Sequence, residues 1–178
     1  AGNDLIVATH GRGLFIADVS FLAEITPEVL AKDVHLFGIE SKMRWTATDR
    51  RDSSSSNYSG QSEPLGIVVN YYLKAKPKTE VKLQVYKGNL LLNEIKGTDT
   101  PGLNAVQWTM TGRRERTAEE AKQAQEQMRR IREMGFTGAG DIGNFASFPV
   151  PDGEYRFVLV IDGKSYLGFA SILPEANN

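Results

Sequence analysis

Alternation of hydrophobic and polar residues dominates this chain and predicts a mainly β fold. In TEVKLQVYK (79–87), Val81, Leu83 and Val85 face one side of an extended strand, and the residues between them are mostly polar. Further runs rich in β-branched and aromatic residues occupy 65–75, 102–110, 153–162 and 164–173. Because turn residues separate these short runs, we expect an antiparallel β-sandwich.

Turn residues indicate where the chain forms β-hairpins, among them Gly88-Asn89 after the run at 79–87. Asp162-Gly163 separates the last two runs, and a type I′ turn there would need positive φ at both positions. The stretch NDLIVATHGRGLFIAD (3–18) holds two short apolar runs around THGRG and predicts an N-terminal hairpin. A lone two-stranded hairpin is marginal in water, so this one is expected to need neighbouring strands.

The pattern divides the chain into two parts. Residues 1–31 are expected to form the hairpin and a linker, with a helical turn over Ser20–Ile25 and a break at Pro27. Residues 32–178 are expected to form the β-sandwich domain, which carries a polar, serine-rich loop at 49–64 and a helical insertion at 113–150. Because the chain opens directly before a strand, we expect it to be a piece of a longer protein.

One α-helix is expected at about 117–134, in RTAEEAKQAQEQMRRIREMG. Thr117 and Glu120 have the spacing of a capping box, and Gly135 is a natural stop. The helix carries a narrow apolar stripe, made of Ala121, Ala124, Met128 and Ile131. We favour a solvated insertion that lies on its own sandwich, and the alternative is a surface for a protein partner.

Composition and charge exclude several classes of function. The 178 residues include 21 basic and 22 acidic side chains, giving a net charge of −1. The chain therefore lacks the excess of positive charge that is typical of nucleic-acid-binding domains. The absence of cysteine excludes disulfides and thiolate zinc sites. No apolar run approaches the roughly 20 residues that span a bilayer, and the start of the chain does not read as a signal peptide.

The chain contains motifs that could support catalysis or cofactor binding, but the sequence around each one does not fit the structure that the motif requires. GAGDIG (138–143) has the letters of a dinucleotide-binding motif, but it follows the predicted helix, and two prolines come after it. The two histidines, His10 and His35, have no metal-ligand spacing and no partner motif for a triad. The aspartates mostly occupy turns, and nothing selects a pair. The residues therefore predict no catalytic residue, no cofactor and no metal site.

Aromatic residues give a candidate sugar-binding surface. Trp45 and Tyr58 flank the serine-rich loop, while Tyr71 and Tyr72 are neighbours on a strand, so one of that pair should face outward. We take Trp45, Tyr58 and Tyr72 as candidate carbohydrate contacts. Local packing under a loop is the competing interpretation, and Trp108, within an apolar strand, is expected in the core.

Several motifs together resemble a known family. In chain order they are DLIVATHGRGLFIADVSFLAEIT (4–26), DVHLF (33–37), Arg44-Trp45, YYLK (71–74), GLNAVQW (102–108) and a closing hairpin with Gly153, Tyr155 and Asp162–Lys164. This series is similar to the C-terminal region of bacterial BNR-repeat, sortilin-like β-propeller proteins, which are often labelled glycosyl hydrolases. The charged helix departs from that pattern, because many relatives carry a variable Gly/Pro-rich loop there.

The resemblance implies a fold, a location and a role. Residues 1–31 would be the remnant of the last propeller blade, followed by an Ig- or fibronectin III-like domain in an extracytoplasmic protein. The domain would be a non-catalytic accessory module whose partner is the propeller of the same parent chain. His10 and Arg12 would then be candidate contacts at the propeller rim. The alternative is a carbohydrate-binding module that assists a glycoside hydrolase.

Overall fold

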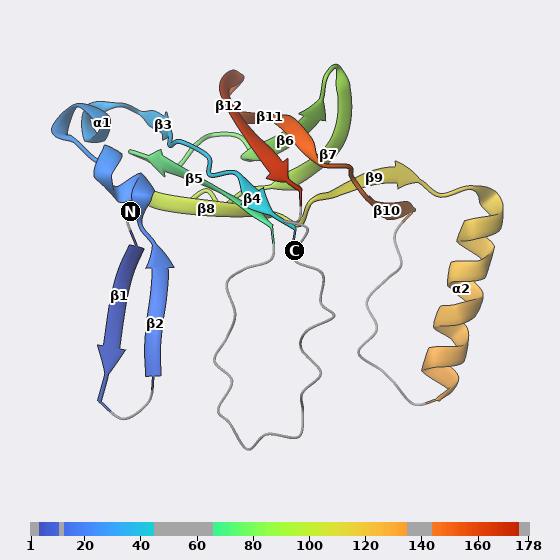
Figure 1. The fold of residues 1–178 in the computed structure, drawn as a ribbon. Coiled ribbons are helices and arrows are strands. Elements are labelled where there is room, and N and C mark those ends of the chain that lie inside the picture. The colour runs from blue at the N-terminus through green and yellow to red at the C-terminus, as the bar shows by residue number, and fades with distance from the viewer. Residues whose placement is uncertain (1–3, 11–12, 45–65, 135–143, 175–178) are drawn as a thin grey trace. The chain divides into compact units, whose positions relative to one another are not determined.

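The computed structural model describes residues 4–10, 13–44, 66–134 and 144–174, and its fold is mainly β (Figure 1). The chain divides into two units, Ala1–Met110 with Pro151–Asn178, and Thr111–Val150. The strands of the first unit are β1 (Asp4–Thr9), β2 (Gly13–Asp18), β3 (Val34–Leu36), β4 (Lys42–Met43), β5 (Ile67–Leu73), β6 (Lys82–Lys87), β7 (Leu90–Lys96), β8 (Gly102–Trp108), β11 (Gly153–Ile161) and β12 (Lys164–Leu173). Two short helices precede β3: η1 (Ser20–Glu24) and α1 (Pro27–Ala31).

The strands of the first unit form three sheets. A three-stranded antiparallel sheet has the order β3-β5-β8, and a five-stranded sheet has the order β4-β12-β11-β6-β7. All pairs in the larger sheet are antiparallel except β4, which runs parallel to β12 at one edge. β1 and β2 pair with each other in a separate hairpin. The expectation of a mainly β fold with antiparallel sheets is confirmed.

The core follows from the two-residue period of the strands. In β5 the alternate residues from Ile67 to Leu73 are buried, as are those of β11 from Tyr155 to Ile161. The indole of Trp108 on β8 contacts two rings of β11, with centroids 4.9 Å from Tyr155 and 5.5 Å from Phe157. Trp108 therefore joins the inner faces of the two larger sheets, and its expected burial is confirmed.

A buried tyrosine fixes the start of β11. The hydroxyl of Tyr155 donates a hydrogen bond to the carbonyl of Pro151, four residues upstream. The ammonium group of Lys87 lies 3.4 Å from that hydroxyl, and it also donates to the carbonyl of Asp152. These contacts tie the turn before β11 to the end of β6.

The segment before β3 contacts the three-stranded sheet. The rings of Phe21 and Phe37 meet edge to face at 5.6 Å, and a carboxylate oxygen of Glu24 accepts from the backbone N–H of Gly38. Pro27 begins α1 rather than breaking the chain, because proline fits the first turn of a helix and Thr26 caps it. The domain boundary at 31/32 stays a prediction.

The second unit is a two-stranded ribbon with a helix inserted between its strands. β9 (Thr111–Glu115) pairs antiparallel with β10 (Phe145–Pro149), and α2 spans Ala118–Glu133, close to the predicted 117–134. The sequence pattern did not predict the ribbon. Its strands are polar or contain proline, and Pro149 is tolerated because it ends a strand at the sheet edge.

The turn between β11 and β12 has the predicted backbone. Asp162 and Gly163 have φ of 48° and 75°, both in the left-handed region. One carboxylate oxygen of Asp162 accepts from the N–H groups of Lys78 and Thr79 and from the Thr79 hydroxyl, at 2.8 to 3.1 Å. These bonds, the Thr79 N–H first, lower the pKa of Asp162. The aspartate therefore also anchors the loop before β6, which the sequence did not indicate.

Replacing Asp162 with proline should break this turn. Proline fixes φ near −65°, where the native value is +48°, and the carboxylate that holds Thr79 is lost as well. We expect the thermal midpoint of Asp162→Pro to fall by roughly 10 °C, measured by circular dichroism. Asp162→Asn is the control, because asparagine tolerates the left-handed region and keeps an acceptor oxygen. Equal midpoints for both variants would contradict the role of the turn.

Candidate functional site

The structure describes two of the five residues predicted from the sequence to make contacts. Trp45, Tyr58 and Arg12 lie outside the described residues, as do the serine-rich loop and the GAGDIG stretch. His10 follows the end of β1 and is exposed, whereas Tyr72 lies on β5. His10 follows a strand of the separate β1–β2 hairpin and Tyr72 lies in the three-stranded sheet, so the structure does not bring them together in one site.

Tyr72 lies on the outer face of the three-stranded sheet, as predicted. It pairs across the sheet with His35 on one side and Leu103 on the other. Its hydroxyl is 3.5 Å from the carbonyl of Leu30, at the outer limit of a hydrogen bond. The ring of Tyr72 is half-buried. The preceding residue, Tyr71, lies on the other face of the sheet and is fully buried. A stacking role for Tyr72 stays a prediction.

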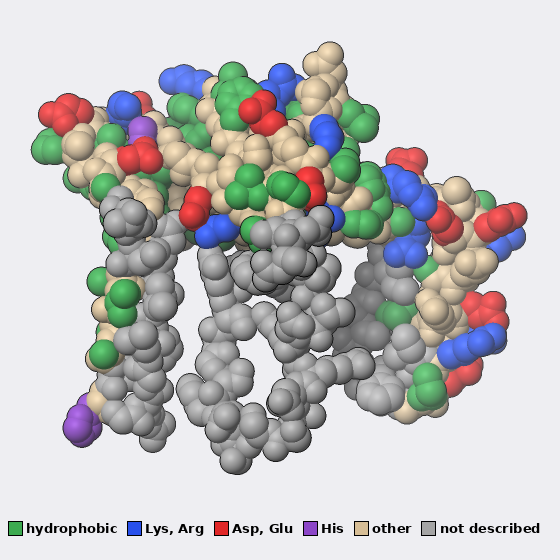
Figure 2. Space-filling view, viewed as in Figure 1, with side chains coloured by type: hydrophobic (Ala, Val, Ile, Leu, Met, Phe, Trp, Pro, Cys, Tyr) green, Lys and Arg blue, Asp and Glu red, His purple; other side chains and the backbone are tan. Residues whose placement is uncertain are grey.

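The β1–β2 hairpin presents apolar side chains on both of its faces. Leu5 and Val7 share one face of β1, and Ile6 lies on the other. These side chains are 51%, 43% and 60% exposed, and Figure 2 shows hydrophobic side chains along this strand. Within the described residues, β2 is the strand that pairs with β1. Strands with apolar residues on both faces are typical of sheets that are covered on both sides.

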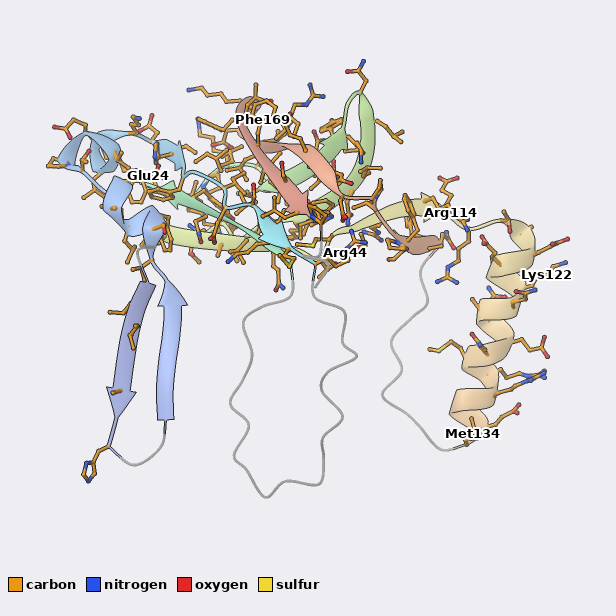
Figure 3. All side chains as sticks on the ribbon, in the orientation of Figure 1. Glu24, Arg44, Arg114, Lys122, Met134 and Phe169 are labelled. Atoms are coloured by element: carbon orange, nitrogen blue, oxygen red, sulfur yellow. The ribbon has the colours of Figure 1, made fainter. Side chains whose placement is uncertain are left out.

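A second apolar surface lies on the outer face of β12. Leu167, Phe169 and Leu173 are 62%, 55% and 42% exposed, and Phe169 is labelled in Figure 3. Across the same sheet, β6 and β7 make polar contacts, including the ion pair of Lys82 with Glu94 at 2.9 Å, although β7 also exposes Leu90 and Leu91. The five-stranded sheet therefore has an apolar outer surface on β12 and a mixed polar and apolar surface on β6 and β7.

The helix of the second unit is attached to its ribbon by an ion pair. Arg114 on β9 donates to both carboxylate oxygens of Glu120, at 2.8 and 2.6 Å. Glu120 also accepts from the N–H of Thr117, whose hydroxyl accepts from the N–H of Glu120, so the predicted capping box is confirmed. The Arg114 hydrogen bonds, followed by the Thr117 bond, lower the pKa of Glu120 to about 2.

The apolar stripe of α2 is narrow, as its sequence indicates. Ala124 is buried and Met128 is half-buried, while Met134 after the helix is exposed. The opposite surface carries the ion pairs of Arg130 with Glu126 and of Arg129 with Glu133. A role of this helix in binding a protein partner stays a prediction.

The described residues offer no metal centre. No group of three or more histidine, cysteine, aspartate or glutamate side chains in the described ranges could hold an ion. His35 lies 3.7 Å from the carboxylate of Glu24, and its ring stacks edge to face on Phe37 at 4.8 Å. The described helices include none with the length and apolar character that a membrane crossing requires.

Comparisons with protein-family models, curated proteins and solved structures find no match to this chain. What the chain does is therefore inferred from its own residues. The sequence reasoning missed the apolar face of β12. A signal for it existed, since Leu167 and Phe169 interrupt the expected alternation with apolar residues on the outward side.

The ion pair at the base of α2 should make Glu120 titrate far below an ordinary glutamate. The pKa of Glu120 is lower in the folded state than in the unfolded chain. The ion pair with Arg114 therefore stabilises the fold fully above about pH 4.5, and this stabilisation is lost as the pH falls through about 2. Arg114→Gln should move the Glu120 midpoint up toward 4.5, as followed by carboxyl ¹³C NMR.

Lys122→Gln, an exposed change on the same helix (Figure 3), should leave that midpoint unchanged. A native Glu120 that titrates near pH 4.5 would contradict the ion pair.

Proposed function

We propose that this chain is a non-catalytic accessory module with an Ig- or fibronectin III-like β-sandwich, joined to a β-propeller of the same parent protein. The observation that carries the proposal is strand β1 of the β1–β2 hairpin, whose apolar residues Leu5, Ile6 and Val7 are exposed on both faces of the strand. The module would support the propeller and hold it through this hairpin. An extracytoplasmic location belongs to the same proposal and rests on the sequence resemblance.

The strand order supports the sandwich. Taken in sequence, β3, β5 and β8 occupy the places of strands A, B and E in an Ig-like sheet. The second sheet then has β6, β11 and β12 as strands C, F and G, with β7 as an added C′ strand. The helical unit, Thr111–Val150, is inserted in the sequence between β8 and β11, which would correspond to strands E and F.

Tyr155 gives a second, independent support for an Ig-like fold. It lies near the start of β11, the strand in the F position, and its hydroxyl donates to a carbonyl four residues upstream. Sandwiches of this class often carry a tyrosine with the same bond at the same corner. Trp108 packs on its ring, so the corner is built into the core.

The hairpin supports attachment to a propeller. A blade of a propeller is a four-stranded sheet that packs between neighbouring blades, so its inner strands are apolar on both faces. Leu5, Ile6 and Val7 have this character and lack such cover in the described part of the chain. His10 and Arg12 fall between β1 and β2 in the sequence and would lie at the rim of the completed blade. The alternative, a carbohydrate-binding module, would use Trp45, Tyr58 and Tyr72; of these the structure describes Tyr72, which is half-buried.

Cysteine accessibility tests this proposal directly, because the chain contains no cysteine of its own. Ile6→Cys should react readily with a maleimide in the isolated chain, since the side chain is 60% exposed. In a longer parent protein with the propeller present, the same cysteine should be protected at least tenfold. The reaction is followed by mass spectrometry.

Leu90→Cys is the matched control, because Leu90 on β7 is 65% exposed and also apolar. It should react equally fast in the isolated chain and in the parent protein. If Ile6→Cys reacts as fast in the parent protein as in the isolated chain, the hairpin does not complete a blade and the proposal fails.

A further inference from the structure

A cavity of about 240 Å³ lies between the beginning of β3, the loop after β5 and the β11–β12 turn. Its floor is the end of the core, where Leu73 and Ile161 are almost fully buried. The polar groups around it come from three distant parts of the sequence: Asp33, Lys74, Lys76, Asp162, Lys164 and Tyr166.

The walls of the cavity are held in place by backbone contacts. The N–H of Lys74 donates to the carbonyl of Asp33 at 2.9 Å, which fixes the loop after β5 against the start of β3. Asp162 holds Thr79 through its carboxylate, which fixes the opposite wall. A small ligand would therefore meet a largely preformed site.

Three lysines supply positive charge to this cavity. Lys164 pairs with Ile161 through the backbone ladder, but its side chain makes no ion pair or hydrogen bond within the described residues. Lys74 reaches only a backbone carbonyl, 3.4 Å from its ammonium nitrogen, and Lys76 lies 3.3 Å from the exposed carboxylate of Asp99. At least one ammonium group is thus available for an anion without the loss of an existing ion pair.

Two carboxylates supply hydrogen-bond acceptors beside these lysines. The carboxylate of Asp162 uses one oxygen for three donors of the chain, and its other oxygen accepts nothing from the described residues. The carboxylate of Asp33 likewise makes no ion pair in the described part of the chain. A bare anion would meet two repelling groups here, whereas a ligand with hydroxyl donors would satisfy them.

We propose that this cavity binds a single sugar acid, a hydroxylated ring that carries one carboxylate. The carboxylate pairs with Lys164 and Lys74, the hydroxyls donate to Asp33 and Asp162, and the half-exposed ring of Tyr166 offers an apolar contact. The volume is below the roughly 300 Å³ at which drug-sized pockets begin, which suits one sugar unit. The inference is independent of the accessory role.

The test is a titration of the ¹⁵N-labelled chain with galacturonate, followed by amide chemical shifts. We expect saturable shifts at the β11–β12 turn, with neutral galactose at the same concentrations producing none. Lys164→Gln should weaken binding by about tenfold or more, because one charge-assisted hydrogen bond is lost. Its thermal midpoint should match that of the native chain, since Lys164 is exposed and unpaired within the described residues.

Lys122→Gln is the matched control, because it removes the same charge from an exposed position in the other unit. Trigalacturonate distinguishes two sources of the ligand, and either is compatible with the proposed site. If trigalacturonate binds as tightly as galacturonate, the ligand is the terminal sugar of an acidic polysaccharide. If it binds more weakly, the ligand is the free monosaccharide acid. The proposal is overturned if galactose binds as well as galacturonate or if inorganic sulfate binds equally well. It is also overturned if Lys164→Gln binds like the native chain, or if galacturonate causes no saturable shift.

Discussion

Packing of the Trp108 indole against the rings of Tyr155 and Phe157 joins the two larger sheets, and the other features of the first unit depend on it. Trp108 is the last residue of β8 in the three-stranded sheet, and both partners lie on the central strand β11 of the five-stranded sheet. Aromatic rings bury large areas and favour tilted or edge-to-face contacts, so this cluster also fixes the orientation of β11. The hydroxyl of Tyr155 extends the same constraint to the turn before the strand.

The two ends of β11 have different structural roles. At its start, the corner made by Tyr155 and Pro151 receives the chain from the helical unit, which is inserted between β8 and β11. At its end, Asp162 and Thr79 fix the turn that forms one wall of the lysine-lined cavity. The helical unit carries its own attachment, since Arg114 and Glu120 link α2 to its ribbon by hydrogen bonds that are local in sequence.

Much of the fold could be predicted from the sequence, because the central strands have an apolar residue at every second, inward-facing position. β5, β6 and β11 bury these alternate residues, and the Asp162-Gly163 turn has the positive φ values that its residues indicate. The missed elements lack such patterns: Pro27 begins a helix in place of ending one, and the β9–β10 ribbon is polar or proline-containing. The cavity could not be predicted, since Lys74 and Lys164 line the same cavity only through tertiary structure. The period alone could show that one of Tyr71 and Tyr72 faces outward, and the structure shows that it is Tyr72.

The central claim is that the β1–β2 hairpin folds apart from the two larger sheets and is left for a partner to cover. Hydrogen exchange of the isolated chain, resolved by NMR, measures this directly, because each amide reports the free energy of the opening that exposes it. The account predicts that β1 and β2 amides exchange through local opening at low cost, while those of β5 and β11 exchange only through global unfolding. Equal protection in the hairpin and in β11 would show that the hairpin is part of the same cooperative core and would contradict the account.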